Sequence, residues 1–539
     1  MCAGAIVADT VRAHPPPLIA RHTGDLVTES PTGAAPPPNT KLDKEVLIVA
    51  GVVVLGAIMS ILDVTVVSVA QNTFQNEFGT DAAGAAWTMT GYTLSLAAVI
   101  PLSAWAAARF GTKNVFLASV VLFTLGSALC ATAVNIEMLV AFRMLQGLGG
   151  GLLMPVGMMI LTKAAGPARM GSVMAALGIP MLLGPICGPI LGGLLIEQLS
   201  WHWIFLINLP IGIIALVYAW FVLDSEYEAS RESIDVLGLL LLSPGLALFL
   251  YGISGSAEEG TFASTRVLLP AGIGLVLIVA FVVHALRTDK PLLDLRLFTN
   301  PTLRTALITM SLFAIAFFGS SLLFPQYFIG IRDEGTMMAG LLMAPQGLGA
   351  MVTMPVAGRL TDRMGPGKFV LSGITVIFAA MLTFPFIGAD TSYWVIGGAL
   401  FVMGLGMGLT MTPIMTSALA RLTPTQVPDG STLLNVTQQT ASSIGTALFS
   451  VLLASNLTSH KESGLAILSN ASEDDYDKLV QAGQAPPKIE DQWFDWAAQA
   501  FGHSFIVSCV LVAITIIPAF FLPRTRITPA EGAPPPMVH

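Results

Sequence analysis

The segment Gly178-Ile-Pro-Met-Leu-Leu-Gly184-Pro185-Ile-Cys187-Gly188-Pro189-Ile-Leu-Gly192-Gly193 lies within a run from Gly171 to Ile196 that contains no charged residue. Such a run is long enough to cross a bilayer as one helix. Its prolines would break a helix in water, but neighbouring helices in a membrane bundle can satisfy the backbone groups that proline leaves free. Three of the glycines are four residues apart and form a smooth stripe along one helix face. The segment therefore predicts a membrane helix that another helix approaches closely.

The composition extends this prediction to the whole chain. Of 539 residues, 54% are hydrophobic and 11% are charged, whereas soluble domains have about 25% charged residues. The net charge of −8 is concentrated in one acidic segment, 456–498, and does not suggest a nucleic-acid partner. Four cysteines and seven histidines form neither a disulfide framework nor a metal pattern. Without a P-loop or a polar catalytic cluster, the chain is predicted to be neither an ATP-driven pump nor an enzyme.

Apolar segments predict an all-α protein with fourteen membrane spans. The predicted spans are 46–70, 84–106, 115–134, 137–161, 171–196, 203–223, 236–254, 267–286, 303–328, 338–357, 368–388, 393–418, 431–455 and 499–522.

The distribution of Lys and Arg predicts the orientation in the membrane. With both tails on the cytoplasmic side, inside segments hold 19 Lys and Arg residues, outside segments hold five, and Arg143 lies within a span. The positive-inside rule therefore places both termini in the cytoplasm. We expect residues 1–45 to form a disordered N-terminal tail and 523–539 to form the C-terminal tail.

An internal repeat divides the spans into two halves. Gly147-Leu-Gly-Gly-Gly-Leu-Leu-Met154 aligns with Gly404-Leu-Gly-Met-Gly-Leu-Thr-Met411, and the segment around Arg109 aligns in the same way with that around Arg363. Parallel halves of this kind are typical of transporters whose substrate binds near the middle of the membrane. The predicted domains are a six-helix bundle over 46–223, two inserted helices with their linkers over 224–302, and a second six-helix bundle over 303–522 that includes the extracytoplasmic loop 456–498.

Two ionisable residues lie deep within predicted spans. Asp63 is in the first span and Arg143 in the fourth, at similar distances from the outer surface. A charged group at such a depth is costly and normally faces a cavity or a partner. Equal depth permits an ion pair. Two structural alternatives are a carboxylate that hydrogen-bonds Thr65 or a neighbouring helix, and an arginine that caps carbonyl groups of the first span.

Three motifs together resemble the major facilitator superfamily, in its branch of fourteen-span drug–proton antiporters. They are Asp63 followed by Thr65 and β-branched residues, Arg143-Met-Leu-Gln146-Gly147, and the glycine-proline segment described above. The resemblance implies a major facilitator fold, a bacterial cytoplasmic membrane and protons as the coupling ion, with no other cofactor. It also implies that Asp63 exchanges protons beside Arg143. In this reading the antiporter motif comprises Gly178, Gly184, Pro185, Gly188, Pro189, Gly192 and Gly193.

The loops after spans two and ten resemble the gating motif of the same superfamily. The later copy keeps the full pattern, with Gly358, Asp362, Arg363 and Gly365. The earlier copy has Arg109 and Gly111, but Ala108 stands where the motif has Asp. We therefore expect the later copy to carry most of the inner gate.

Residues that could line a substrate cavity are suggested by helical spacing and by side chains that adapt to varied ligands. A core role is the alternative for each. The candidates are Gln146, Phe317, Phe318, Tyr327, Met407, Met411, Asn435, Gln438 and Gln439.

The predicted function is export of lipophilic, often cationic, drugs or toxic compounds by alternating access. One alternative is an exporter of a specific endogenous lipid, siderophore or peptide-like metabolite, with loop 456–498 binding an envelope protein. Another is a receptor or scaffold that keeps the fold without transport, and this alternative requires Asp63 and Arg143 to be dispensable.

Overall fold

The computed structural model describes residues 43–166, 169–224, 233–457, 461–471, 473–482, 484–486 and 488–525, which belong to one compact unit of the chain. Every regular element within these ranges is helical. The predicted tails fall mostly outside these ranges, since the structure describes neither residues 1–42 nor 526–539.

The first half of the chain contains six predicted spans. Its helices are α1 (Lys44–Val69), the short α2 (Gln71–Phe78), α3 (Ala82–Val99) continued by η1 (Ile100–Leu102) and α4 (Ser103–Phe110), α5 (Thr112–Cys130), α6 (Ile136–Ala165), α7 (Met170–Gln198), and α8 (Trp203–Leu206) with α9 (Asn208–Val222).

The remaining spans follow the same order as the sequence prediction. They are α10 (Val236–Glu259), α11 (Thr265–Arg287), α12 (Pro301–Phe313) continued by η4 (Ala314–Phe318), α13 (Gly319–Ser321) and α14 (Leu323–Gly330), α15 (Thr336–Met364), α16 (Pro366–Met381), α17 (Tyr393–Leu419), α18 (Val427–Leu457) and α21 (Asp491–Ala519). Among the described residues, thirteen helical segments are long and apolar enough to cross a membrane. The 29-residue helix α7 is additional to these and carries the uncharged run.

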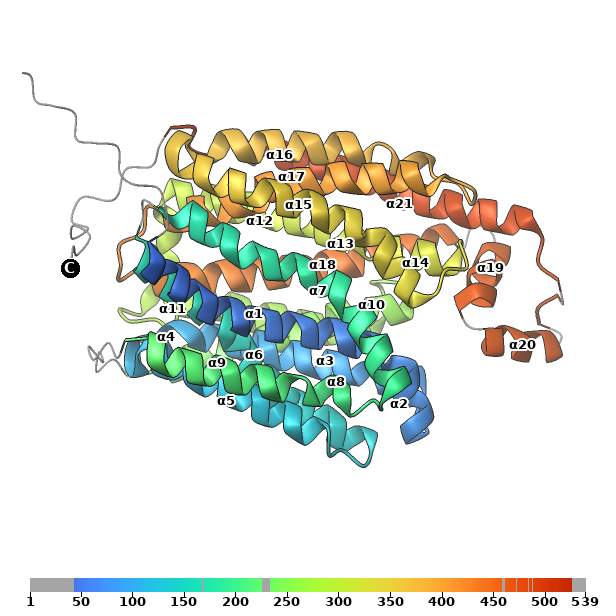
Figure 1. Ribbon diagram of the computed structural model, residues 1–539, viewed down its shortest axis with the longest axis horizontal. Coiled ribbons are helices and arrows are strands. Elements are labelled where there is room, and N and C mark those ends of the chain that lie inside the picture. The colour runs from blue at the N-terminus through green and yellow to red at the C-terminus, as the bar shows by residue number, and fades with distance from the viewer. Residues whose placement is uncertain are drawn as a thin grey trace, which may run out of the picture. The chain divides into compact units, whose positions relative to one another are not determined.

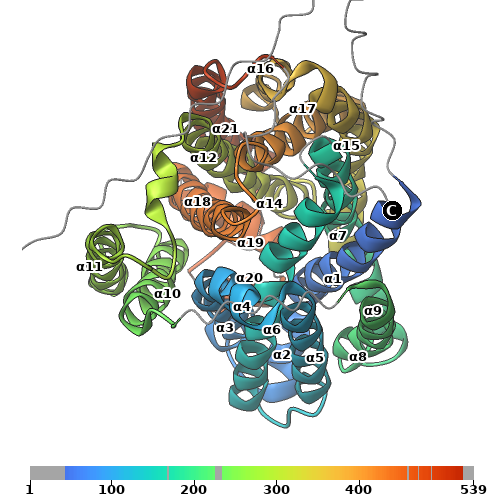
Figure 2. The same ribbon diagram turned by 90° about the vertical axis from the view of Figure 1, so that its left-hand side faces the viewer.

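The helices form two bundles that meet along α7 and α18. Viewed along the helices, α1, α3, α5, α6 and α9 form one group and α12, α15, α16, α17 and α21 the other (Figure 2). Helix α7 contacts α1 in its own half and α15 and α17 in the other, while α18 contacts α4 and α6. The two inserted helices α10 and α11 pack on each other, and α10 also contacts α3 and α18 at the side of both bundles. Two helical bundles with two additional helices are the architecture that the sequence predicted.

The acidic segment between α18 and α21 contains two short helices, α19 (Lys461–Ala471) and α20 (Glu473–Gln481) (Figure 1). Helix α19 packs against α14 and α21. The side chain of Asn470 donates a hydrogen bond to the carbonyl of Gly330 over 3.3 Å. The segment that the sequence suggested as a loop is therefore anchored to the second bundle through α19.

Helix α7 is continuous through its prolines, and its glycine stripe faces α1. A Cβ atom added to Gly184 would collide with Ile61, one added to Gly188 would collide with Thr65, and one added to Gly192 would lie 3.2 Å from the carbonyl oxygen of Val66. Helix α1 is therefore the close neighbour that the spacing predicted. The side chains of Pro185 and Pro189 lie outside what the structure describes.

A methyl group on this stripe should separate α1 from α7. We expect Gly188→Ala to destabilise the protein by about 1–3 kcal/mol, because an overpacked interface forces backbone shifts. Gly193→Ala is the matched control, since a Cβ at Gly193 meets nothing within 4 Å. Unfolding of the two purified variants in detergent would test this, and equal stability of the two would contradict the close approach.

Candidate functional site

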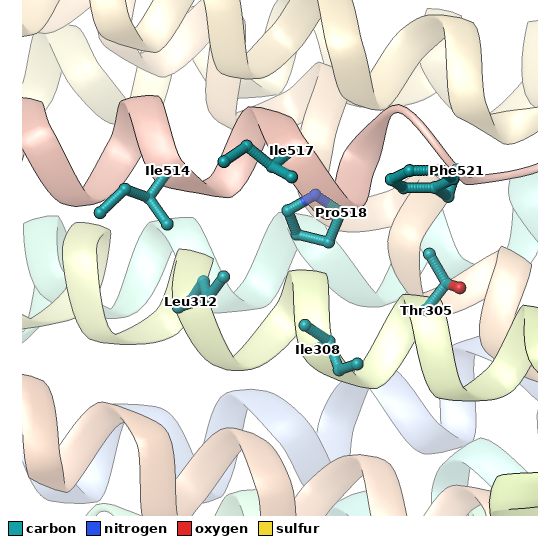
Figure 3. Close-up of a pocket in the computed structure, with 7 residues that line it drawn as sticks. All are labelled: Thr305, Ile308, Leu312, Ile514, Ile517, Pro518 and Phe521. Carbon is teal, nitrogen blue, oxygen red and sulfur yellow. The ribbon is translucent and has the colours of Figure 1, made fainter.

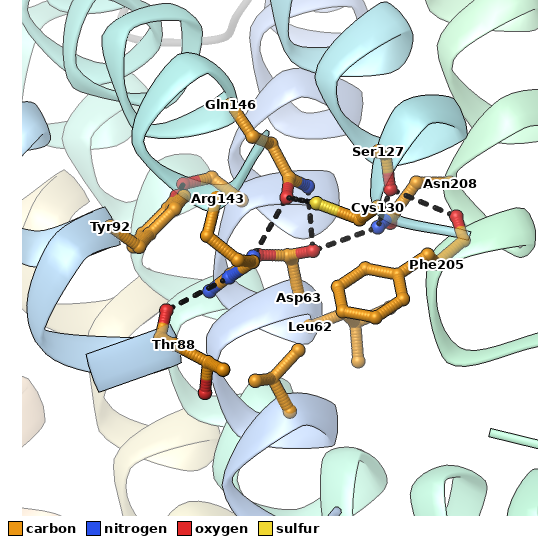
Figure 4. Close-up of polar contacts among 12 residues, drawn as sticks. Leu62, Asp63, Thr88, Tyr92, Ser127, Cys130, Arg143, Gln146, Phe205 and Asn208 are labelled. Atoms are coloured by element: carbon orange, nitrogen blue, oxygen red, sulfur yellow. Dashed lines mark hydrogen bonds and ion pairs between the residues drawn. The ribbon is translucent and has the colours of Figure 1, made fainter. Parts of the chain in front are cut away.

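The predicted ion pair is present at the centre of the first bundle. Arg143 Nη1 lies 2.5 Å from Asp63 Oδ2, and each residue is 1% exposed (Figure 4). Thr65 is not a partner of the carboxylate, because its hydroxyl donates to the carbonyls of Ile61 and Leu62 within α1. Asp63 instead joins α1 to neighbouring helices.

Two amide side chains complete the shell around the carboxylate. Gln146 Nε2 donates to Asp63 Oδ1 over 2.7 Å, and Asn208 Nδ2 donates to the same oxygen over 3.0 Å. Gln146 is one turn after Arg143 on α6, and Asn208 is the first residue of α9. The carboxylate therefore accepts hydrogen bonds from two helices besides its own.

The guanidinium of Arg143 is held from several sides. Its Nε donates to the carbonyl of Thr88 over 3.2 Å, and its Nη1 also donates to Gln146 Oε1 over 2.8 Å. The guanidinium carbon lies 4.2 Å from the ring centre of Tyr92, whose hydroxyl is 3.2 Å from Ser60 Oγ. A cation packed on an aromatic ring gains further stabilisation when both are desolvated. Arginine cannot release its proton in a protein, so the guanidinium keeps its positive charge beside the carboxylate.

Sequence reasoning missed several members of this cluster. Asn208 and Ser127 are polar residues within apolar spans, a signal that could have marked both. Ser127 Oγ accepts from Asn208 Nδ2 over 3.1 Å and donates to the carbonyl of Phe205 over 2.9 Å. Thr88 takes part through its backbone carbonyl, which a sequence cannot single out. Gln146, which the sequence suggested for the substrate cavity, takes part in the ion-pair cluster and is fully buried.

A second polar contact joins the two bundles where α15 meets α7. Asp362 Oδ1 accepts the backbone N–H of Gly171 over 2.8 Å, and its Oδ2 accepts from the N–H and the hydroxyl of Ser172 over 3.2 and 3.0 Å. The residue before α7, Arg169, provides no side-chain cap. A carboxylate beside the free N–H groups at a helix start is favourable. Asp362 therefore caps α7 from the opposite half.

The earlier copy of the motif makes no such contact through residue 108, which is alanine. Helices α4 and α18 are joined instead by the buried hydroxyls of Ser103 and Thr432, 2.8 Å apart. Ser431 adds a hydrogen bond to the carbonyl of Pro155 over 3.0 Å. The later copy thus contributes a charged group to the contact between the halves, and Ser103, Thr432 and Ser431 contribute neutral ones beside α4 and α18. In that earlier copy Arg109 is exposed and Gly111 has a φ of 82° at the turn between α4 and α5.

The other glycines of the later copy also lie at close approaches. A Cβ atom on Gly358 would lie 2.5 Å from the carbonyl oxygen of Gly171, and one on Gly171 would lie equally close to that of Gly358. Gly178 faces Met354. Gly365 ends α15 with a φ of 90°, a value that favours glycine. Arg363 is exposed at the same helix end.

Loss of the Asp362 carboxylate should loosen this contact. We expect Asp362→Asn to favour separation of the bundles at this end by roughly tenfold, because a hydrogen bond to a charged group contributes about 1.5–3 kcal/mol. After the native cysteines are replaced, Ser431→Cys provides a buried thiol as a reporter. A maleimide should label this thiol faster in the protein that also carries Asp362→Asn than in the one that keeps Asp362. Asp390→Asn, in the turn between α16 and α17, is the control. Unchanged labelling would show that Asp362 does not hold this end closed.

The candidate cavity residues differ in accessibility. Asn435, Gln438, Gln439 and Phe318 are partly exposed, and Asn435 Nδ2 contacts Met158 across the bundle interface over 3.3 Å. The other second-half candidates, Phe317, Tyr327, Met407 and Met411, are buried. Tyr327 donates its hydroxyl proton to the carbonyl of Gly388 over 2.7 Å. Contact of these four with a substrate would require a conformation that uncovers them.

A separate groove of about 350 Å³ opens on the side of the second bundle (Figure 3). It lies between α12 and α21, and several of its side chains are among the exposed hydrophobic residues. None of the cavity candidates lines it. The lining residues are Thr305, Ile308, Leu312, Ile514, Ile517, Pro518 and Phe521.

Two helical bundles, the first with a buried acid–arginine pair at its centre, define a membrane transporter of the two-bundle type. The sequence model of the Major Facilitator Superfamily matches residues 53–446, and the chain belongs to this superfamily. Solved structures agree on the fold. The human organic anion transporter MFSD10 aligns with a TM-score of 0.56 at 15% identity, covering 87% of this chain and 100% of that one. The proton:xylose symporter XylE aligns with a TM-score of 0.53 at 12% identity, covering 89% and 96%.

Related sequences carry multidrug-resistance names. A multidrug resistance protein B homolog of Mycobacterium tuberculosis is 48% identical over 499 residues, covering 90% of this chain and 92% of that protein. A putative multidrug resistance protein MdtD of Salmonella typhi is 32% identical over 408 residues, covering 75% and 85%. The chain is thus a multi-pass membrane transporter of the major facilitator class.

Proposed function

We propose that this transporter exports lipophilic, often cationic, compounds across the bacterial cytoplasmic membrane in exchange for protons, by alternating access. The observation that carries the proposal is the buried Asp63–Arg143 pair. The names of the relatives support the substrate class. In this proposal the chain has fourteen spans and both termini in the cytoplasm, as the distribution of basic residues predicts.

The geometry suggests how one proton couples to one change of conformation. The Asp63 carboxylate joins α1 to α6 and α9 while it is ionised. Protonation removes its charge and weakens these bonds, so the two protonation states favour different helix arrangements. Coupling requires only that proton and substrate bind the two conformers with different affinities. Asp362 would hold the cytoplasmic end closed in the conformer described here.

Export of a specific endogenous compound is the second candidate. Helix α19, which packs on the second bundle, and the acidic helix α20 beside it favour this candidate, because they offer a surface to which an envelope protein could bind. Such a partner would add a route across the envelope without changing the proton chemistry at Asp63.

A transport assay tests the proposal directly. Inverted membrane vesicles that contain the wild-type protein should accumulate members of a panel of fluorescent lipophilic cations when the vesicle lumen is made more acidic than the outside medium. Accumulation should stop when an ionophore dissipates the gradient. If no compound moves, broad drug export is wrong; if transport persists without the gradient, proton coupling is wrong.

A further inference from the structure

The side-chain oxygen of Asn208 has no hydrogen-bond partner within the described part of the chain, although the residue is fully buried. Its Nδ2 group is used twice, donating to Asp63 Oδ1 over 3.0 Å and to Ser127 Oγ over 3.1 Å. A buried polar atom without a partner is costly and calls for an explanation. The free oxygen lies on the side chain that contacts the proposed proton-exchanging acid.

Gln146 provides the comparison, because it donates to the same carboxylate oxygen. Its Oε1 accepts from Arg143 Nη1 over 2.8 Å and lies 3.7 Å from Cys130 Sγ. Rotating the Gln146 amide would therefore break bonds on both of its ends. Rotating the Asn208 amide would break the two bonds made by its Nδ2 but none made by its oxygen. Of the two amides beside Asp63, Asn208 is the one that can turn at lower cost.

Protonation changes what Asp63 requires from its neighbours. A carboxylate only accepts hydrogen bonds, whereas a carboxylic acid also donates one through its O–H. Among the described residues, the three groups that hydrogen-bond Asp63, from Arg143, Gln146 and Asn208, all donate to it. The acid therefore needs an acceptor that the ionised state does not use. The oxygen of Asn208 meets this need once the amide rotates.

We propose that Asn208 is a positioning residue for proton exchange: its amide donates to ionised Asp63 and, after rotation, accepts the O–H of protonated Asp63. The inference rests on the proposed function. One O–H bond forms on Asp63 Oδ1 as a hydronium ion of the acidic solution gives up a proton and becomes water, and the carboxylate becomes a neutral acid. Ser127 can adjust because a hydroxyl both donates and accepts.

The position of Asn208 connects this rotation to the helices. Asn208 begins α9 directly after Ile207, the single residue between α8 and α9, whose backbone keeps helical angles. The hydroxyl of Ser127 donates to the carbonyl of Phe205 in α8. A change in the Asn208 side chain therefore acts at the junction of α8 and α9.

Asn208→Leu separates this role from a purely structural one, because leucine neither donates nor accepts. We expect gradient-driven transport to fall at least tenfold at every pH. The midpoint of the transport pH profile should move by less than about half a unit, because both ionised and protonated Asp63 lose a hydrogen-bond partner. A group that only donates to the carboxylate would instead raise the midpoint by about one unit or more and preserve the maximal rate. That result, or an unchanged profile, would overturn the inference.

Infrared spectroscopy of the purified protein provides a readout that does not depend on transport. The C=O band of protonated Asp63 is identified by its loss in Asp63→Asn, and it should move to higher wavenumber in Asn208→Leu as the acid loses its acceptor. An unmoved band would overturn the inference even if transport proved not to be proton-coupled. Asn208→Gln should bring the band part of the way back toward its wild-type position. Asn456→Leu is the control for the loss of a partly buried amide elsewhere in the protein. It removes an amide on α18 that donates to Ser504 on α21 over 3.0 Å, and it should leave the band unchanged.

Discussion

Asp63→Asn is expected to abolish uphill transport while leaving substrate exchange intact. One pH unit supplies about 1.4 kcal/mol for each proton, so exchange of one proton for one substrate can sustain roughly tenfold accumulation. Asparagine keeps the shape of the side chain and an oxygen that accepts from Arg143, but it cannot carry a proton. The accumulation ratio should therefore fall to one in inverted vesicles under an imposed gradient.

Two controls make this result specific. Exchange of labelled for unlabelled substrate without a gradient should continue in Asp63→Asn, which would show that the variant is folded and binds substrate. Asp81→Asn replaces a carboxylate that caps α3 through Gly84, and asparagine caps helices about as well. This control should transport like the wild type. Continued gradient-driven accumulation by Asp63→Asn would exclude Asp63 as the coupling acid.

Arg143→Gln is expected to be the most destabilising single change in the first bundle. It leaves the buried Asp63 carboxylate without its counter-ion, and breaking a buried pair in this way costs about 3–5 kcal/mol. The double variant Asp63→Asn/Arg143→Gln should regain part of the loss, because it leaves no unpaired charge. Denaturation of the four forms in detergent, analysed as a double-mutant cycle, measures the coupling.

A surface pair provides the matched control. Arg266 lies 3.5 Å from Glu259, and its side chain is 87% exposed. Exposed pairs contribute little to stability, so Arg266→Gln should leave unfolding almost unchanged. If Arg143→Gln were equally mild, or if the double variant were less stable than both single variants, the pair would not be the organising contact of this bundle.

Local patterns in the sequence were sufficient for much of this architecture. Helices α1 and α6 begin and end within a few residues of the predicted spans, because hydrophobic length is set by the bilayer and can be counted along the chain. The glycine stripe of α7 faces a helix as predicted, since residues four apart share one face. The equal depth of Asp63 and Arg143 permitted an ion pair, and the structure contains it.

Contacts that depend on where one helix begins relative to another could not be predicted in this way. The family motif led us to expect Asp362 at the gate, but its caps on Gly171 and Ser172 depend on how α15 meets the start of α7. The carbonyl of Thr88 is a backbone group and has no signature in the sequence. Asn208 stands in an apolar span and was overlooked because no spacing rule links it to Asp63.

The sequence by itself determined that this chain is a two-bundle membrane transporter with one acid and one arginine buried at the same depth. Hydrophobic length, helical period and charge distribution are local properties, and a lipid environment makes them decisive because buried charge and unpaired backbone groups are so costly there. Only the tertiary structure decided which groups surround the pair and which atom among them is left free. Those contacts join α1, α3, α6 and α9 across up to 145 residues of chain. A hydrogen bond is made or lost by a change of a few tenths of an ångström in the donor–acceptor distance, and the packing of the helices sets that distance.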